Sequence, residues 1–478
     1  MTDLKKQVLH SLKWVAISKL AIQLFRWLST FIVIRMLAPE DYAVMAVADM
    51  VAGYLVAFSS LGLGAILVTK KVVNETFKRE MLFLAYLANA TLFLLQFFGA
   101  DYIASAYNNE GIAFVLQASS LCYLFNIFTL LPSSALTRDM QFKKTSLIEL
   151  YAGITSTVVI ITFAYLDFGY TALVLGHLTN EILKAILIIR ASNAYIVPKI
   201  PRRRSWKLMS YSVSVSISEV IFHSRDSIDV LLGGLFLSKQ SLGVYSVGLQ
   251  VSSMPLRKIA PPLRKVAFPA LASIRDQKDR LVGYLNKIQR ISFVVTIPIF
   301  WGLASTVDLF LPALLGDQWS SASSIISILC LVMPFRFAEE MLHPILKSKQ
   351  KGKEMMLCNV IGLVVFGGTV FFGLQFGLLG LAIAWLVSAP LIYFLSCIIV
   401  CKMMEIPLGE FVSQWQKSAL AGALMLVAVA AIKHLLAPHI DPLFIFGISA
   451  VFGGAVYIGG VFVLQRSLIS EIKHLKRA

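Results

Sequence analysis

The stretch RMLAPEDYAVMAVA, residues 35–48, aligns without gaps with LFLSKQSLGVYSVG, residues 235–248, at an offset of 200 positions. Each copy closes a long apolar segment that carries polar residues, turns within a few positions, and opens a second apolar segment. Another pair, SALTRDMQFKKTSLIEL (133–149) and HPILKSKQKGKEMMLCN (343–359), is similar at an offset of 210. The repetition predicts two copies of one structural unit in the chain.

The composition around these repeats is that of a membrane protein. Of the 478 residues, 58% are hydrophobic and 14% are charged, and the mean hydropathy is +0.77. Soluble domains are far less apolar and carry about twice as much charge. The apolar runs are about 20 residues long, which suits membrane-spanning helices, whereas the strands of outer-membrane barrels are about ten residues long and alternate in polarity. We therefore expect an all-α integral membrane protein.

Apolar runs and loop signals predict fourteen spans. Their ranges are 13–36, 42–66, 81–99, 112–136, 147–167, 170–190, 207–236, 242–262, 287–306, 321–346, 355–374, 378–401, 416–436 and 443–465. The repeat divides them into an N-lobe of six helices (1–200), a C-lobe of six (207–405), a terminal helix pair (412–466) and a basic tail (467–478). Because six is an even number, both lobes keep the same orientation in the membrane.

The chain has a net charge of +17, and its Lys and Arg residues are concentrated in alternate loops. Seven regions are rich in Lys and Arg: the N-terminus, 69–80, 137–144, 197–207, 263–287, 347–353 and the C-terminal tail. The alternate loops contain one such residue or none. This alternation predicts that both termini are cytoplasmic. The positive charge is explained by topology, so it gives no reason to expect a nucleic-acid partner.

Two polar stripes occupy equivalent helices of the two lobes. SKLAIQLFRW (18–27) aligns with SEVIFHSRDS (218–227), so that Lys19 matches Glu219 and Arg26 matches Asp226. Spacings of three and four residues place each set on one helix face. One stripe is basic and the other is acidic.

A cation at the centre of a bilayer costs about 2.5–3.5 kcal/mol on insertion scales, so such residues normally face a cavity or a partner. Three interpretations compete. The two stripes pair with each other and hold the lobes together, or Lys19 and Arg26 line a cavity for an anionic substrate together with Arg225 and Arg336, or these side chains reach the membrane surface. The first two combine if the pairs open to bind an anion, which would make them a gate.

The acidic residues within the spans raise the question of ion coupling. The candidates for gate or coupling groups are Asp49, Glu219, His223, Asp226 and Glu339. These residues either bind protons or sodium ions or form structural ion pairs with nearby arginines, and the sequence leaves both interpretations open. For Asp49 the sequence offers no obvious local ion-pair partner, so a structural role explains this residue least well.

Motifs for catalysis are absent from the sequence. There is no Walker A sequence, no GxSxG and no HExxH, so we expect no catalytic residue, no metal and no cofactor beyond a coupling ion. The five cysteines have no metal-binding spacing and are expected to be core thiols. The prolines of SSMPLRKIAPPLRK (252–265) stand where a helix would otherwise continue, so we expect an interruption there, as an ordinary loop, a hinge or a basic patch for lipid headgroups. The segment 274–290 is expected to form an amphipathic helix on the inner membrane surface.

Some of these residues make the chain resemble a known family. RMLAPEDYAVMAVA is similar to the R-x-L-x-P-E-D-Y-G signature of Wzx-type polysaccharide flippases, which belong to the multidrug, oligosaccharidyl-lipid and polysaccharide exporter superfamily. RKVAFPALASIRDQKDRLVGYLNK (264–287), IPIFWGLA and LLGDQWSSA are similar to the matching region of the second lobe. The resemblance covers most of residues 10–400 and is closest to the colanic acid and teichuronic acid exporters. Ala43 stands where the family usually has glycine.

The resemblance implies a transporter rather than an enzyme. Such a protein turns undecaprenyl-pyrophosphate-linked oligosaccharide from the cytoplasmic to the periplasmic leaflet of a bacterial inner membrane by alternating access, for lipopolysaccharide, exopolysaccharide or capsule synthesis. The implied partners are this lipid, the surrounding membrane lipids and other polysaccharide assembly proteins. Pyrophosphate suits fixed guanidinium and ammonium donors, which the basic stripe supplies.

Two alternatives remain open. A multidrug antiporter of the same superfamily would share the lobes, but its cationic substrates favour an acidic cavity. A polysaccharide polymerase or ligase would need a large outward loop with Arg and His, whereas the loops predicted to face outward are short and nearly free of Arg.

Overall fold

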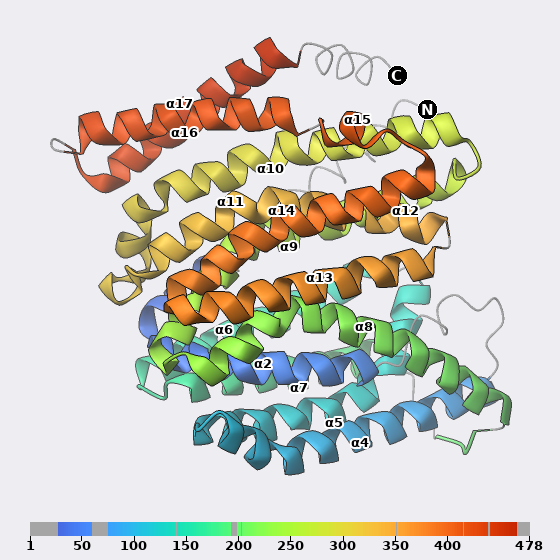
Figure 1. Ribbon diagram of the computed structural model, residues 1–478. Helices are drawn as coiled ribbons and strands as arrows, with labels where there is room; N and C mark the ends of the chain where they lie inside the picture. The colour runs from blue at the N-terminus through green and yellow to red at the C-terminus, as the bar shows by residue number, and fades with distance from the viewer. Residues whose placement is uncertain are drawn as a thin grey trace, which may run out of the picture. The chain divides into compact units, whose positions relative to one another are not determined.

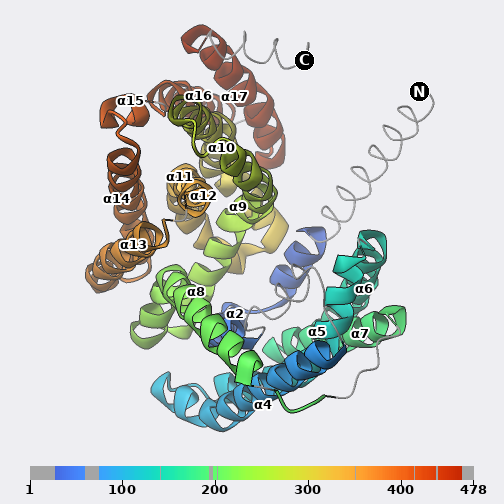
Figure 2. The ribbon, with the colours of Figure 1, turned by 90° about the vertical axis from the view of Figure 1, so that its right-hand side faces the viewer.

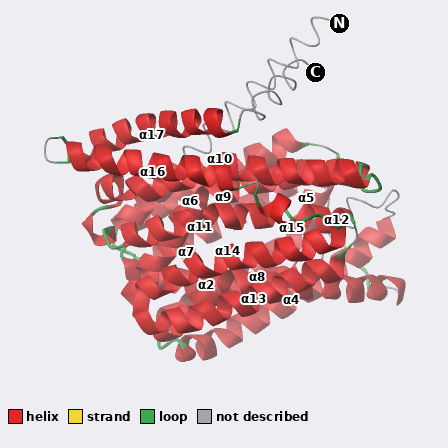
Figure 3. Cartoon of the chain, turned by 45° about the horizontal axis from the view of Figure 1, so that its top comes forward, coloured by secondary structure: helices red, strands yellow, loops and turns green. Residues whose placement is uncertain are grey.

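The computed structural model describes residues 27–59, 75–139, 141–192, 198–201, 203–349, 351–413, 415–437 and 440–465 (Figure 1). Within these ranges the side chains of 57, 137–138, 142, 203–219, 265–266, 268–270, 272, 410 and 412 are left out. Throughout this described part the secondary structure is helical and contains no strand (Figure 3). The chain divides into two compact units, which meet in sequence between Val220 and Ile221.

In its described residues, the first unit holds the helical segment Trp27–Met36 and five long helices. These are α2 (Pro39–Ser59), α4 (Glu75–Ala106), α5 (Glu110–Arg138), α6 (Phe142–Tyr165) and α7 (Tyr170–Ser192). Helix α8 (Arg203–Phe236) begins in the first unit and ends in the second.

The second unit continues with α9 (Lys239–Ser273), α10 (Lys278–Leu315), α11 (Ala322–Glu340), α12 (His343–Ser348), α13 (Gly352–Gly373) and α14 (Gly377–Met404). It ends with α15 (Leu408–Val412), α16 (Gln416–Leu436) and α17 (Pro442–Leu464). Two short 3-10 turns, Asp317–Trp319 and Leu374–Phe376, precede α11 and α14.

The expected all-α membrane fold is confirmed. Each of the fourteen predicted spans overlaps a helix of the described residues, the first of them from Trp27 onward. Eight helical segments are long and apolar enough to cross a membrane by themselves, and one of these, Gly352–Met404, contains both α13 and α14. Among the long helices, α2, α8, α9 and α11 fall outside this set, and each of them carries charged residues. The protein is a multi-pass membrane protein.

The two units pair their helices in the same order. In the first unit α2 packs on α4, α5 and α7, α4 on α5, α5 on α7, and α6 on α7. In the second unit α9 packs on α10, α11 and α14, α10 on α11, α11 on α14, and α13 on α14. A duplicated six-helix unit would have this pattern, while the lobe boundaries at 1–200 and 207–405 stay a prediction. Helices α16 and α17 pack on each other and on α10 (Figure 1).

The second unit is built around α11. Figure 2, which looks nearly along the helices, shows α11 with its neighbours α9, α10 and α14 around it. Ile325, Leu329, Met333 and Ala338 of α11 are fully buried. At this buried position any charged side chain of α11 must find its partner within the protein.

The signature residue Asp41 ties two helices of the first unit together. One carboxylate oxygen accepts a hydrogen bond of 3.0 Å from the backbone N–H of Ala38, and the other accepts one of 2.8 Å from the N–H of Tyr170 at the start of α7. Gly169 has a φ of +54°, and a Cβ added there would lie 2.7 Å from the Asp41 carboxylate. The turn before α7 therefore requires glycine beside this aspartate.

Two expectations for the second unit are wrong. Helix α9 continues to Ser273 through Pro255, Pro261 and Pro262, because its packing on α11 and α12 outweighs the backbone hydrogen bonds that the prolines remove. The segment 274–290 does not form a separate surface helix: residues from Lys278 onward are the first turns of α10. Leu281 and Leu285 are fully buried there, so this face meets protein rather than lipid headgroups. The expectation that the five cysteines are core thiols is confirmed, since all are buried and free.

Candidate functional site

Four helices of the first unit enclose a cavity of about 480 Å³, here named the N-unit cavity. Helices α2, α4, α5 and α7 each contribute one face. Its polar lining consists of Asp49, Ser59, Asn89, Gln96, Ser119, Tyr123, Asn126, Thr129, Ser133, His177, Glu181 and Lys184. The volume lies within the range of about 300–1,000 Å³ that is usual for small-molecule sites.

Helical spacing explains why these side chains converge. His177, Glu181 and Lys184 follow each other at intervals of four and three residues along α7, and Asn89 and Gln96 are seven residues apart on α4. Such intervals place side chains on one face of a helix. Each of the packed helices thus turns a polar stripe inward, which is the arrangement expected for polar residues in membrane-spanning helices.

Part of the cavity wall is fixed by hydrogen bonds. The Gln96 amide donates to the Leu116 carbonyl at 2.8 Å and to Ser119 Oγ at 2.9 Å, while its oxygen accepts the Tyr123 hydroxyl proton at 3.0 Å. The Asn89 amide donates to the carbonyls of Ser59 and Ala85, both at 2.9 Å. Asn89 Oδ1 is buried and has no hydrogen-bond partner among the described residues.

The charged groups of the N-unit cavity lie on α2 and α7. The Lys184 ammonium is 3.7 Å from Glu181 Oε1, and Asn180 donates to the same oxygen at 2.9 Å. Asp49 and His177 are exposed. No arginine lines the cavity within the part of the chain that the structure describes.

A second group of charges lies in the other unit, between α8 and α11. This α8–α11 charge cluster comprises Arg225 and Asp226 of α8, Arg336, Glu339 and Glu340 of α11, with Arg264 and His343 beside them. Three basic and three acidic groups pair off. The cluster is therefore neutral when His343 is neutral.

Arg225 and Glu339 form its buried centre. The guanidinium nitrogens donate to the two carboxylate oxygens at 2.7 and 3.0 Å, in the bidentate geometry that makes such pairs strong. Arg225 also donates to Asn359 Oδ1 of α13 at 3.5 Å, and His343 Nε2 lies 3.2 Å from Glu339. With both residues buried, neither charge is left without a partner.

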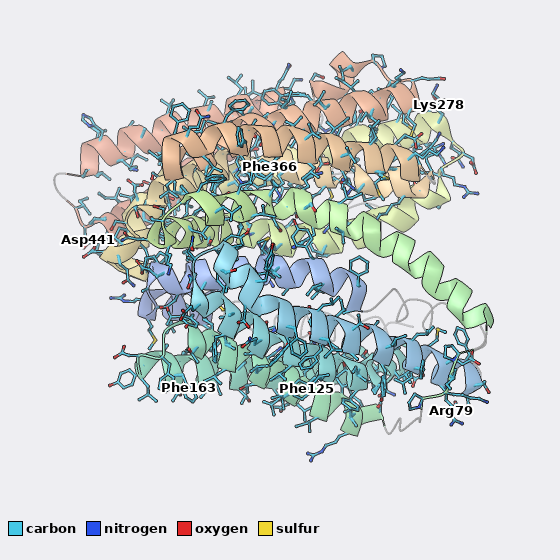
Figure 4. All side chains as sticks on the ribbon, turned by 60° about the horizontal axis from the view of Figure 1, so that its bottom comes forward. Arg79, Phe125, Phe163, Lys278, Phe366 and Asp441 are labelled. Carbon is cyan, nitrogen blue, oxygen red and sulfur yellow. The ribbon has the colours of Figure 1, made fainter. Side chains whose placement is uncertain are left out.

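The remaining pairs are nearer the surface of the cluster. Arg336 Nη2 lies 3.1 Å from Asp226 Oδ1, and its guanidinium carbon lies 4.8 Å from the centre of the Trp385 ring. Arg264 reaches from α9 to Glu340 at 3.4 Å. The Trp385 ring packs against Phe366 of α13, with 4.2 Å between the ring centres. Phe366 is labelled in Figure 4.

A third polar group lies outside the predicted site residues. Asp229 of α8 is completely buried and accepts hydrogen bonds from the Tyr245 hydroxyl and from Trp385 Nε1, the latter at 3.2 Å. Trp385 Nε1 also lies 2.8 Å from the Tyr245 hydroxyl oxygen. Three helices are joined at this point, because α8, α9 and α14 each supply one member.

The structure places the predicted site residues in two different environments. Asp49 lines the N-unit cavity, whereas Arg225, Asp226, Arg336 and Glu339 meet in the α8–α11 charge cluster. His223 lies 3.4 Å from Ser227 Oγ on the same helix. Lys19, Arg26 and the side chain of Glu219 lie outside the described residues. The roles assigned to these residues in substrate binding, gating and coupling stay predictions.

Sequence reasoning also overlooked most of the N-unit cavity. Asn89, Gln96, Asn126 and His177 are polar positions in apolar helices, and their spacing of three, four or seven residues along each helix is the signal that could have found them. Among the described residues, no group of three His, Cys, Asp or Glu side chains could hold a metal ion.

Comparisons with known proteins agree with this architecture. The chain is 22% identical over 400 residues to the teichuronic acid biosynthesis protein TuaB of Bacillus subtilis, covering 80% of each chain. It is 23% identical over 493 residues to the succinoglycan biosynthesis transport protein ExoT of Rhizobium meliloti, covering 99% of this chain and 96% of ExoT. The fold is similar to that of the lipid II flippase MurJ in an inward closed conformation, with a TM-score of 0.76, 16% identity, and 95% and 99% of the two chains covered.

The family model described as "Polysaccharide biosynthesis protein" matches residues 32–324, more than half of the chain and parts of both units. The family expected from the signature at residues 35–48 is thereby confirmed. This protein belongs to the family of polysaccharide biosynthesis proteins.

Proposed function

We propose that this protein is a flippase that moves undecaprenyl-pyrophosphate-linked oligosaccharide units from the cytoplasmic to the periplasmic leaflet of a bacterial inner membrane. In this proposal both termini are cytoplasmic, the protein is a transporter and not an enzyme, and it serves surface polysaccharide synthesis. Its partners are the lipid-linked oligosaccharide, the surrounding lipids and other polysaccharide assembly proteins.

The observation that carries the proposal is the N-unit cavity. A hydroxyl-rich headgroup loses its hydration in the bilayer core, at a cost of several kcal/mol for each unsatisfied polar group. Amide, hydroxyl and charged side chains inside apolar, membrane-spanning helices would replace that hydration. Membership of a polysaccharide biosynthesis family, and relatives named for teichuronic acid synthesis and succinoglycan transport, support the same substrate class.

Alternating access between the two units is the mechanism that we propose. Lys19, Arg26, Arg225 and Arg336 would bind the pyrophosphate. Arg225 and Arg336 are paired with carboxylates in the described state, so they would have to exchange carboxylate oxygens for phosphate oxygens, which accept the same bidentate hydrogen bonds. That exchange would make the α8–α11 charge cluster a gate.

The energy for the outward step has two proposed sources. An anionic headgroup that leaves an inside-negative cell gains about 2.3 kcal/mol per charge for each 100 mV. Protonation or sodium binding would add to this, and the candidate coupling groups are Asp49, Glu219, His223, Asp226 and Glu339. Since three of these five lie in the second unit beside basic residues or Ser227, a change in their charge would alter the gate pairs.

A second candidate function, antiport of cationic compounds, is favoured by one observation. Two carboxylates, Asp49 and Glu181, line the N-unit cavity, and carboxylates attract cations. The same cavity also contains Lys184 beside Glu181. The experiment described next separates these two functions.

The proposal is tested by the leaflet distribution of undecaprenyl-linked repeat units in cells that lack the protein. We expect the units to accumulate on the cytoplasmic side and surface polysaccharide to be lost. Wild-type protein should restore export and Arg26→Ala should not. Arg190→Ala, at an exposed arginine near the end of α7, is the matched control and should restore it. Intact units that reach the outer leaflet unpolymerised would favour an enzyme, and a normal distribution would favour the antiporter.

A further inference from the structure

We propose that the N-unit cavity is a sugar subsite, which binds the uncharged sugar rings next to the pyrophosphate and does not bind the pyrophosphate itself. Asn126 of α5 and Lys184 of α7 are its recognition residues. This inference rests on the proposed function and adds to it a division of the headgroup between two places in the protein.

The charge of the cavity lining argues against a pyrophosphate site. Diphosphate groups are bound by several fixed cations, most often arginines with two parallel N–H donors. Lys184 is the lysine of the described lining, and the Glu181 carboxylate lies 3.7 Å from it. An anion placed beside Lys184 would therefore also meet the repulsion of Glu181. A hydroxyl group can instead accept from the ammonium and donate to the carboxylate.

The hydrogen-bonding groups of the lining suit a sugar ring. The Asn126 side chain lines the cavity and makes no hydrogen bond to the described residues, and the same is true of the exposed His177 ring. Asn89 Oδ1 is buried without a partner although the amide nitrogen of the same side chain makes two hydrogen bonds. A buried acceptor of this kind costs about 1–3 kcal/mol unless a ligand or water satisfies it. Sugar hydroxyls both donate and accept, so they can satisfy all three groups.

The rest of the wall is already organised. Gln96 uses both amide protons and its oxygen in bonds to α5, so it holds α4 against α5 and has little left for a ligand. The hydroxyls of Ser119 and Thr129 donate to backbone carbonyls of α5 and keep acceptor capacity toward the cavity. A rigid wall with a few unsatisfied groups is the usual construction of a small-molecule site.

The experiment compares two soluble ligands that differ by one sugar. The full-length protein in lipid nanodiscs is titrated with farnesyl pyrophosphate and with farnesyl pyrophosphate bearing a single N-acetylglucosamine, by isothermal titration calorimetry. Wild-type protein should bind the glycosylated ligand more tightly. Asn126→Leu should lower the affinity for the glycosylated ligand about two- to tenfold, which is the loss expected for one hydrogen bond. It should leave the affinity for farnesyl pyrophosphate unchanged.

Two further variants make the comparison sharp. Lys184→Gln should also lower the affinity for the glycosylated ligand and leave that for farnesyl pyrophosphate unchanged. This variant keeps the test informative if the Asn126 variant fails to fold. Gln117→Leu is the matched control, because Gln117 lies on the same helix and bonds to Asp101 away from the cavity lining. It should leave the affinity for both ligands unchanged.

The outcomes separate the subsite from the function. If Asn126→Leu and Lys184→Gln weaken both ligands equally, the cavity binds the pyrophosphate and the sugar subsite is wrong. If both variants bind the glycosylated ligand as tightly as wild-type protein does, the cavity plays no part in recognition and the sugar subsite is again wrong. If wild-type protein binds neither ligand and export continues in cells that lack it, the proposed function itself fails.

Discussion

The guanidinium of Arg225 on α8 and the carboxylate of Glu339 on α11 form a buried bidentate ion pair, with N–O distances of 2.7 and 3.0 Å across 114 residues of sequence. Removal of one partner from such a pair leaves a buried charge without compensation, which typically costs about 3–5 kcal/mol. We expect Arg225→Met and Glu339→Met each to destabilise the protein by about this amount. The double variant should lose much less unfolding free energy than the sum of the two single losses, since it leaves neither of these two charges buried. Thermal unfolding in detergent measures all three, and additive losses would contradict the pairing.

Gly362 of α13 leaves room for the Arg225 side chain. A Cβ at this position would lie 2.7 Å from Arg225 Cδ and 3.0 Å from Nε. The ion pair with Glu339 prevents the arginine from moving away freely, so we expect Gly362→Ala to destabilise the protein by about 1–3 kcal/mol. Gly368 lies on the same helix with nothing within 4 Å of its added Cβ. Gly368→Ala should be neutral or stabilise by up to about 1 kcal/mol. Equal unfolding temperatures for the two variants would refute the steric argument.

The Tyr245 hydroxyl connects Asp229 to Trp385 inside the second unit. Without this hydroxyl, one oxygen of a completely buried carboxylate loses a donor, and the cost of such a loss is about 1–3 kcal/mol. We therefore expect Tyr245→Phe to lower the thermal stability clearly. Tyr151→Phe, at an exposed tyrosine of α6, is the control and should change little. A loss no larger than that of the control would show that the three-residue network contributes nothing to stability.

Asp226 and Arg336 should respond differently to neutralisation if they form a gate. Asp226→Asn removes the partner that holds Arg336 at 3.1 Å and leaves the arginine available for phosphate, so transport should persist. Arg336→Gln removes the phosphate ligand itself and should abolish transport. Export of surface polysaccharide by cells that carry each variant is the measurement, with protein abundance checked by immunoblot. Loss of export in both variants, with protein abundance unchanged, would contradict a gate in which Asp226 only restrains Arg336.

The ion pair of Lys278 and Glu405 predicts a dependence on pH. Lys278 begins α10, and Glu405 follows α14 in a left-handed conformation with a φ of 56°. The hydrogen bond from Lys278, and then its charge, hold the pKa of Glu405 below its usual value of 4.5. A lowered pKa means that the pair stabilises the folded protein above the pKa of the unfolded chain. This stabilisation is lost as the pH falls through the folded pKa.

Lys278→Ala should therefore lower the unfolding temperature slightly at pH 7, and the difference from wild type should shrink as the pH falls through the lowered pKa of Glu405. Glu405→Gln should behave like Lys278→Ala at pH 7. Thermal unfolding of the purified variants across this pH range provides the comparison. A difference that persists undiminished at low pH would assign the effect of Lys278 to packing instead of charge.

Much of the architecture could be predicted because the bilayer imposes simple rules on a sequence. Backbone groups in lipid must be hydrogen-bonded within the segment, so an apolar run of about 20 residues becomes a helix. The predictions failed where local rules met tertiary packing. Pro255, Pro261 and Pro262 should end a helix by themselves, but α9 continues because it packs on α11 and α12. Burial of Leu281 and Leu285 likewise makes 278–290 part of α10.

The sequence by itself determined the fold class, the presence of the helices and the family, because apolar run length and the signature at residues 35–48 can be read without knowing any contact. Spacing on a helix also marked the polar faces. Only the tertiary structure decided which residues meet across helices. Arg225 pairs with Glu339, and Asn89 and His177 line one cavity, because the order and rotation of packed helices bring together faces that lie far apart in sequence. A helix face can be derived from periodicity, but its partner depends on the packing of the whole unit.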